Sequence, residues 1–212
     1  MRPGRRAASR GAALALTTAL AAGCGGSDPS AAPSAPAVPT WNGSAPSAPS
    51  RPVRLTYAEP MRRSVPVSIR IPKLGVSAPV SQLGLRPDGR IEEPPLSRPN
   101  LAGWYKEGPS PGEAGPSVIL GHVDANRRPA VFHRLTELYP GDLIEVTRQD
   151  GTVAKFAVVQ MARVSKSRFP GELIYAEDID YPALRLVTCG GSFDERTGHY
   201  TENIIAFTRL VK

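Results

Sequence analysis

The chain has 212 residues, enough for one ordinary domain or two small ones, because domains usually contain roughly 100–200 residues. Its 26 Lys and Arg outnumber its 19 Asp and Glu, but six of the basic and two of the acidic residues lie in residues 1–61, which therefore hold more than half of the net charge of +7. A nucleic-acid-binding domain is expected to concentrate basic side chains, interleaved with aromatic ones, on its folded part, and aromatic residues make up only 6% of this chain. The composition argues against nucleic acid as a partner.

An export signal is predicted at residues 1–24. Four arginines within the first ten residues precede an apolar stretch at residues 11–22, which is shorter than the about 20 apolar residues that a transmembrane helix needs. The sequence Leu-Ala-Ala-Gly-Cys that ends at Cys24 resembles the lipobox of bacterial lipoproteins, which makes Cys24 a candidate lipidation site. The alternative is an ordinary or uncleaved signal in which Cys24 has no role. Either way, we expect the rest of the chain at the outer face of the cell membrane.

Residues 25–62 are dominated by Pro, Ala, Ser and Gly and contain almost no large apolar side chains. Such a composition cannot bury enough apolar surface to fold, and proline stiffens it. We expect a disordered tether here and a single folded domain at residues 63–212.

The folded part shows mainly strand patterns. Val65, Val67, Ile69 and Ile71 follow the two-residue period of a half-buried strand. Turn sequences rich in Pro, Gly and Asp, at residues 87–89, 140–142 and 150–151, separate the later strands. The later strands are expected at residues 117–122, 143–147, 153–164, 184–189 and 203–210.

One short helix is predicted at residues 129–138, where Val131, Phe132, Leu135 and Leu138 share a roughly helical face. Everything else indicates a mostly β fold. Many short strands joined by Gly and Pro turns favour a closed or nearly closed antiparallel barrel.

Cys189 is the candidate nucleophile. Exported proteins usually pair their cysteines, so a cysteine left over suggests a reactive thiol. If Cys24 carries a lipid, Cys189 has no partner; a Cys24–Cys189 disulfide and a buried inert thiol are the alternatives. Gly190 and Gly191 follow, and their lack of side chains would let a substrate carbonyl approach Cys189 and backbone N–H groups turn toward an oxyanion.

A cysteine nucleophile needs a neighbouring base or positive charge, because a free thiol has a pKa near 8.5. His122 ends an apolar strand and is the preferred partner, since imidazole titrates near neutrality; a structural or solvated histidine is the alternative. His133 is interpreted as structural or solvated, whereas His199 could line the site. Asp124 is expected to turn the chain rather than to orient His122.

These segments resemble the sortase family, and most closely the class F sortases of actinobacteria. The resemblance rests on Leu-Gly-His-Val-Asp at residues 120–124 and Leu-Val-Thr-Cys-Gly-Gly-Ser-Phe-Asp at residues 186–194, and it extends over about residues 65–212. It implies a closed eight-stranded β-barrel with one or two short helices. It also implies a monomeric cysteine transpeptidase that cleaves a Leu-Pro-x-Thr-Gly-like sorting signal between Thr and Gly, holds the acyl chain as a thioester and passes it to an amine acceptor of the cell envelope, such as a cell-wall precursor.

Carried over by position, Cys189 attacks the threonine carbonyl and His122 protonates the leaving amine. The family's third catalytic residue is an arginine near the start of the last strand, where this chain has Thr-Glu-Asn at residues 201–203. Arg196 and Asn203 are the candidates for that role. No metal or cofactor is expected, because the sequence contains neither Cys-x-x-Cys nor His-Glu-x-x-His.

Two other readings remain open at this point. The L,D-transpeptidases also pair an exported β-rich domain with Cys and His, but their Ser-x-Gly-Cys signature is absent. A non-enzymatic envelope lipoprotein, in which Cys189 and His122 bind a metal or another ligand, is the alternative from a different functional class.

Overall fold

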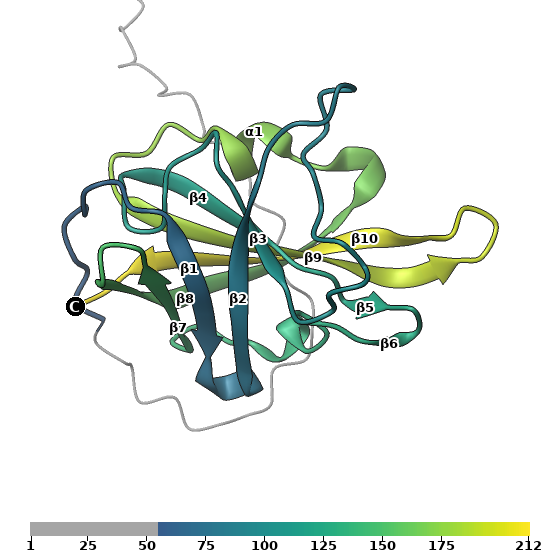
Figure 1. Ribbon diagram of the computed structural model, residues 1–212, viewed down its shortest axis with the longest axis horizontal. Coiled ribbons are helices and arrows are strands. Elements are labelled where there is room, and N and C mark those ends of the chain that lie inside the picture. Colours follow the sequence, from purple (N-terminus) through teal and green to yellow (C-terminus); the bar gives the residue numbers. More distant parts are fainter. Residues whose placement is uncertain (1–54) are drawn as a thin grey trace, which may run out of the picture. The chain divides into compact units, whose positions relative to one another are not determined.

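In a computed structural model, which describes residues 55–212, eight strands close a barrel in the order β1-β2-β3-β4-β9-β10-β8-β7 (Figure 1). The strands are β1 (Pro66–Ile71), β2 (Val76–Leu83), β3 (Ala102–Tyr105), β4 (Gly115–Leu120), β7 (Leu143–Arg148), β8 (Val153–Ser165), β9 (Pro182–Asp194) and β10 (His199–Leu210). The predicted mostly β, eight-stranded barrel is confirmed. The expectation of antiparallel pairing throughout is wrong, because β2 and β3, and also β4 and β9, run parallel.

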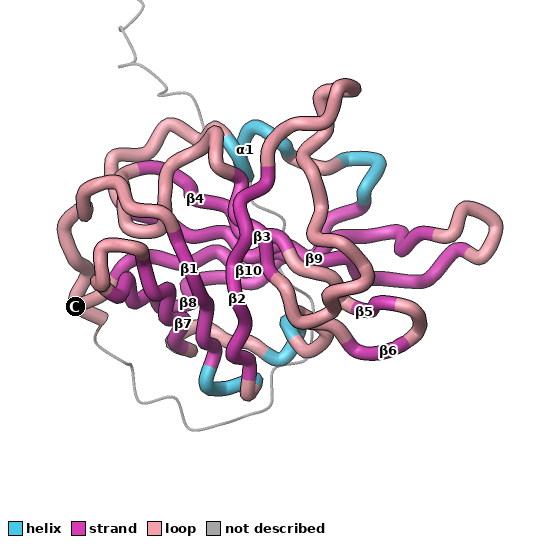
Figure 2. The backbone as a smooth tube through the Cα atoms, viewed as in Figure 1, coloured by secondary structure: helices cyan, strands magenta, loops and turns pink. Residues whose placement is uncertain are grey.

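The remaining elements are short. A small hairpin joins β5 (Asp124–Ala125) and β6 (Arg128–Pro129), and the helical pieces are η1 (Pro72–Leu74), η2 (Leu135–Glu137), η3 (Lys166–Arg168) and α1 (Gly171–Tyr175) (Figure 2). The helix predicted at residues 129–138 is therefore wrong apart from the single turn η2. Its apolar residues are nevertheless buried. The backbone N–H groups of Val131 and Phe132 bond to Pro99 and His122 instead of to a preceding helical turn.

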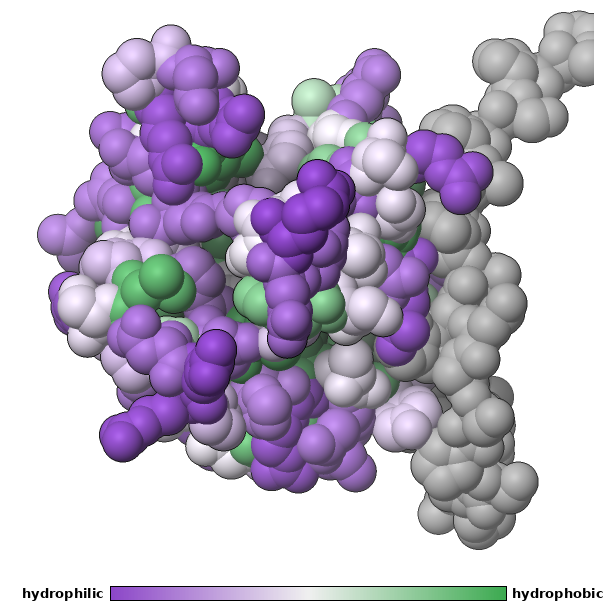
Figure 3. Space-filling model, turned by 90° about the vertical axis from the view of Figure 1, so that its right-hand side faces the viewer, coloured by the Kyte–Doolittle hydropathy of each residue, from purple (hydrophilic) through white to green (hydrophobic). Residues whose placement is uncertain are grey.

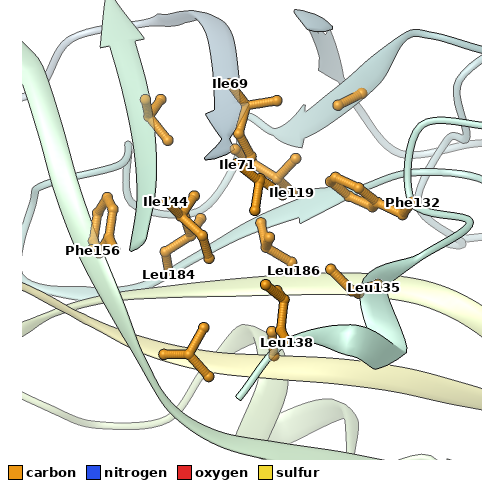
Figure 4. Close-up of a cluster of buried hydrophobic side chains, with 14 of the residues drawn as sticks. Ile69, Ile71, Ile119, Phe132, Leu135, Leu138, Ile144, Phe156, Leu184 and Leu186 are labelled. Atoms are coloured by element: carbon orange, nitrogen blue, oxygen red, sulfur yellow. The ribbon is translucent and has the colours of Figure 1, made fainter. Parts of the chain in front are cut away.

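The barrel interior is filled by aliphatic and aromatic side chains from several strands and from the segment around η2 (Figure 4). Ile69 and Ile71 of β1 are almost fully buried there, as the alternation predicted. Val67, which the same alternation places inside, is instead 42% exposed. The pairing of β1 with β7 shifts register between Pro66 and Ser68, and such a bulge turns one side chain to the opposite face.

The strands β4, β8, β9 and β10 are also covered on the outside of the barrel. Val118, Val187, Ile205 and Phe207 form a second apolar cluster with Ile174 of α1, and Phe169 and Tyr175 pack against it. Leu184 and Leu186 of β9 face the interior cluster. Both faces of β9 are therefore buried, and the one charged side chain in its buried part, Arg185, is paired with Glu177 at 2.5 Å.

The first described residues are attached to the end of the chain. Tyr57 forms an isolated bridge with Val211, and the backbone N–H of Ala58 donates to the carbonyl of Leu210 at 3.1 Å. Arg148, which is 1% exposed, donates to the carbonyl of Arg62. Tyr57, Ala58 and Arg62 make these contacts although they precede residue 63, the expected start of the folded domain. The predicted export signal, the candidate lipidation site Cys24 and the predicted tether up to residue 54 lie outside the described residues.

None of the helices in residues 55–212 has the length and apolarity to cross a membrane. No three His, Cys, Asp or Glu side chains in the same range are grouped so that they could hold a metal ion.

Candidate active site

A cavity of about 660 Å³ lies on the outer face of β4, β9 and β10. Its floor comes from the ends of these strands, and its two walls come from the β2–β3 connection and from the segment that contains η3 and α1. The lining residues are Gly89, Arg90, Ile91, Glu93, Pro94, Leu120, Gly121, His122, Lys166, Phe169, Tyr175, Val187, Thr188, Cys189 and Asn203. Beside the cavity, β9 and β10 continue as a hairpin that extends beyond the barrel (Figure 1).

Cys189 reaches this cavity because of the strand period. Val187 belongs to the outer cluster, and Cys189 lies two residues further along β9, so that both side chains face the same side. The thiol is free and half-buried. Asn203 of β10 is paired directly with Cys189, which brings their side chains together on one face.

His122 follows β4, which runs parallel to β9 with Leu120 level with Val187. The backbone N–H of Gly121 continues this ladder by donating to the carbonyl of Val187 at 3.1 Å. His122 lies two residues after Leu120, and Cys189 lies two residues after Val187. The parallel pairing therefore places the imidazole level with the thiol on the same face, and both line the cavity.

The hydrogen bond at Nε2 of His122 determines how its ring is protonated. Nε2 lies 2.6 Å from the carbonyl oxygen of Pro94, and a carbonyl can only accept, so Nε2 carries a proton. Among the described residues Nδ1 has no hydrogen-bond partner. Nδ1 is therefore the ring nitrogen that is free to exchange a proton with the thiol or a substrate.

The family model of the sortase domain matches residues 69–211, which is more than half of the chain. The chain belongs to the sortase family. Sortases are cysteine transpeptidases, and the free thiol and the imidazole of this sortase domain share one cavity.

Solved sortase structures share the fold. Sortase A from Corynebacterium diphtheriae is 20% identical with a TM-score of 0.53, and the match covers 71% of this chain and 62% of that one. A Clostridium perfringens sortase D5 transpeptidase is 23% identical with a TM-score of 0.52, covering 70% and 79%. Sortase C-1 from Actinomyces oris is 20% identical with a TM-score of 0.53, covering 69% and 75%. A comparison with curated proteins finds no match.

The backbone of His122 is held from inside the sortase barrel. Phe132, which is fully buried, donates from its N–H to the carbonyl of His122 at 3.0 Å. Gly121 allows this close approach, because a Cβ at that position would lie 2.4 Å from Cδ2 of Phe132 and 2.7 Å from Cγ1 of Val131. The glycine in Leu-Gly-His is thus required by packing next to the site.

We expect Gly121→Ala to destabilise the domain by about 1–3 kcal/mol, because the added methyl group overpacks the core around Phe132. It should also lower catalytic activity by displacing His122. Thermal unfolding measures the first effect. Gly171→Ala is the matched control, since nothing lies within 4 Å of a Cβ there, and an unchanged melting temperature in Gly121→Ala would contradict the prediction.

Gly190 and Gly191, which follow Cys189, were expected to make room for a substrate. The structure gives a different reason for each glycine. A Cβ at Gly190 would lie 2.6 Å from Cγ1 of Ile204, inside the barrel and away from the cavity. Gly191 has φ +76°, a conformation that favours glycine, at the start of the protruding part of the hairpin. Packing and backbone geometry therefore explain both residues without a substrate.

Asp124 accepts a hydrogen bond from the hydroxyl of Tyr200, and this bond raises the pKa of Tyr200. The contact joins β5, just after His122, to the hairpin of β9 and β10. Tyr200 also packs edge-on against Phe193, with the ring centroids 5.2 Å apart. Asp124 thus anchors the chain, in agreement with a structural role.

The other sequence candidates lie away from Cys189. Arg196 lies in the turn of the protruding hairpin, where its side chain is 84% exposed and 3.7 Å from Asp194. His199 is exposed at the start of β10, and His133 is exposed with Nδ1 donating to the carbonyl of Val123 at 3.1 Å. None of these three residues lines the cavity. The face that carries the hairpin is mainly polar, with only small separate apolar areas (Figure 3).

The sequence led us to expect the loop at residues 165–180 to line the substrate groove, but it identified no site residue within that loop. Lys166 of η3 places its Nζ 3.4 Å from Sγ of Cys189, and the residues around it gave no readable pattern. The apolar wall includes Tyr175, whose burial raises its pKa to about 12. Both residues belong to the connection between β8 and β9, and only the fold brings that connection over Cys189.

Proposed function

We propose that this protein is an extracytoplasmic sortase that transfers the acyl part of a Leu-Pro-x-Thr-Gly-like sorting signal to an amine. The observation that carries the proposal is the free thiol of Cys189 beside the imidazole of His122 in one cavity of a sortase domain. The resemblance at residues 120–124 and 186–194 supports class F as the subtype.

The reaction begins at Cys189. Its proton passes to Nδ1 of His122, and the sulfur attacks the threonine carbonyl carbon of the signal. The tetrahedral intermediate collapses when the carbon–nitrogen bond to glycine breaks, and His122 gives its proton to the leaving amine. A thioester remains on Cys189. An incoming amine then attacks the thioester, His122 accepts its proton, and an amide forms as the thiolate leaves.

The cavity has an apolar and a polar part, which suits an extended peptide with apolar residues before the scissile bond. Ile91, Leu120, Phe169, Tyr175 and Val187 provide the apolar surface. Cys189, His122 and Asn203 provide the polar part. We place the Leu-Pro of the signal on the apolar surface and its Thr-Gly bond at Cys189.

The location and partners follow from the N-terminal sequence and the proposed reaction. The predicted export signal and the lipobox-like sequence at Cys24 support attachment to the outer face of the cell membrane. There the proline-rich tether would hold the domain near proteins that carry sorting signals and near amine acceptors of the envelope. We propose that the enzyme acts as a monomer.

The test is turnover by the full chain on fluorogenic peptides of the Leu-Pro-x-Thr-Gly type, with oligoglycine as acceptor and mass spectrometry of products and enzyme. We expect cleavage between Thr and Gly, a ligated product, and an acyl adduct on Cys189 that hydroxylamine releases. Absence of both cleavage and adduct across the panel would reject the proposed substrate class. Cleavage without ligation to any amine would reject the transferase activity in favour of a hydrolase.

A further inference from the structure

Lys166 is a cationic side chain in direct contact with the sulfur of Cys189. Its Nζ lies 3.4 Å from Sγ of Cys189, and the lysine lines the cavity together with Cys189 and His122. Within residues 55–212, no carboxylate lies within ion-pair distance of this ammonium group. Its charge is therefore available to the reacting atoms.

The fold presents Lys166 to the cavity across β10. Ser165 ends β8 opposite Glu202, and the next residue along β10, Asn203, is paired with Cys189. The chain then turns into η3, where the side chain of Ser165 accepts a hydrogen bond from the N–H of Ser167 at 3.3 Å. This cap fixes the direction in which the chain leaves the strand and thus the start of the lysine side chain.

The site needs a positive charge, and Arg90, the other described cation that lines the cavity, has a 79% exposed side chain that lies 3.5 Å from the carboxylate of Asp88. Negative charge develops first on the sulfur and then on the oxygen of the tetrahedral intermediate. The start of β10 carries Glu202, whose carboxylate lies 3.4 Å from Arg163. Asn203 offers only a neutral donor, and Arg196 is exposed in the hairpin turn.

We propose that Lys166 is the third catalytic residue, whose ammonium group stabilises the thiolate of Cys189 and then donates a hydrogen bond to the oxyanion. This inference rests on the proposed transpeptidase function. The proton of Cys189 goes to His122 and later to the leaving amine, so Lys166 keeps its own protons throughout. When the sulfur–carbon bond forms, the carbonyl electron pair moves to the oxygen, and the lysine balances that charge until the carbon–nitrogen bond breaks.

The experiment compares Lys166→Met, Lys166→Arg and Arg168→Met in the full chain. Arg168 is the matched control, because it is an exposed cation in the same short helix η3 but does not line the cavity. A Cys24→Ser background leaves Cys189 as the only thiol in the chain. The two readouts are the rate of Cys189 alkylation by iodoacetamide and kcat/KM for peptide cleavage.

We expect Lys166→Met to slow alkylation by at least about fivefold, because a unit charge is lost 3.4 Å from the sulfur. It should also lower kcat/KM by about 100-fold. This is the lower end of the usual effect of removing an oxyanion donor, because solvent screens the charge of the exposed lysine. Lys166→Arg should recover most of both losses, and Arg168→Met should change neither. Thermal unfolding should be unchanged in all three variants.

Wild-type rates in Lys166→Met, or equal losses in Arg168→Met, would overturn the proposal. An acyl group found on Lys166 by peptide mapping would also overturn it, since the amine would then act as a nucleophile. If the wild-type chain cleaves none of the peptides, the proposed substrate class fails while alkylation still decides whether Lys166 acts on the sulfur.

Discussion

Replacing Cys189 with alanine should abolish both peptide cleavage and the acyl adduct, because no other thiol among the described residues faces the cavity. Every bond change in the proposed reaction involves the sulfur, so the residual rate should fall to that of the uncatalysed reaction. The side chain is small and only half-buried, and the substitution should leave thermal unfolding nearly unchanged. The measurement is kcat/KM together with the intact mass of the enzyme after incubation with peptide.

Cys24→Ser is the matched control, because it removes the other cysteine of the chain and changes none of the described residues that line the cavity. It should cleave soluble peptides like the wild-type chain. Cleavage between Thr and Gly that persists in Cys189→Ala would exclude thioester chemistry at this residue.

His122→Gln should lower kcat/KM by roughly 10²–10⁴-fold, the usual contribution of general acid–base catalysis. Glutamine is close in size and can still donate to the carbonyl of Pro94, so the cavity wall should keep its position. It cannot transfer a proton from the thiol to the leaving amine. Steady-state kinetics over a range of peptide concentrations would show the loss mainly in kcat.

His133→Gln is the control for this substitution, since that imidazole is exposed, bonds to the carbonyl of Val123 and does not line the cavity. Its activity should match the wild type. If His122→Gln keeps more than a tenth of the wild-type kcat/KM, another group must move the proton.

Much of the barrel was predictable because its strands follow local rules. Ile69 and Ile71 alternate with outward residues, and the turn at residues 150–151 joins β7 to β8 as the Asp-Gly signal predicted. The errors arose where contacts between distant segments decide the local structure. Val67 turns outward at a bulge in the pairing with β7. In the predicted helix, Val131 and Phe132 bond to Pro99 and His122, and only the single turn η2 forms.

The same division holds for the site. Cys189 and His122 could be named from the sequence because each follows a run of mainly apolar residues, and a reactive side chain at such a place is a local pattern. The expected strand end at Cys189 is wrong, because β9 continues to Asp194 as one arm of the hairpin. Their position on one face could not be derived from either segment, because it depends on the parallel pairing of β4 with β9. Residue periodicity predicts which residues share the face of a strand, but it does not predict which strands become neighbours.

Lys166 shows what only the tertiary structure decides. It lies 23 residues before Cys189 in a segment with no recognisable motif, yet its ammonium group lies 3.4 Å from the sulfur. That contact requires β10 to lie between β8 and β9 and η3 to turn the chain back over the sheet. The sequence alone therefore determined the family, most of the strand pattern and the two candidate reactive residues, because these depend on short-range chemistry. The position of the Lys166 ammonium group beside Cys189 depends on long-range packing, which no local pattern encodes.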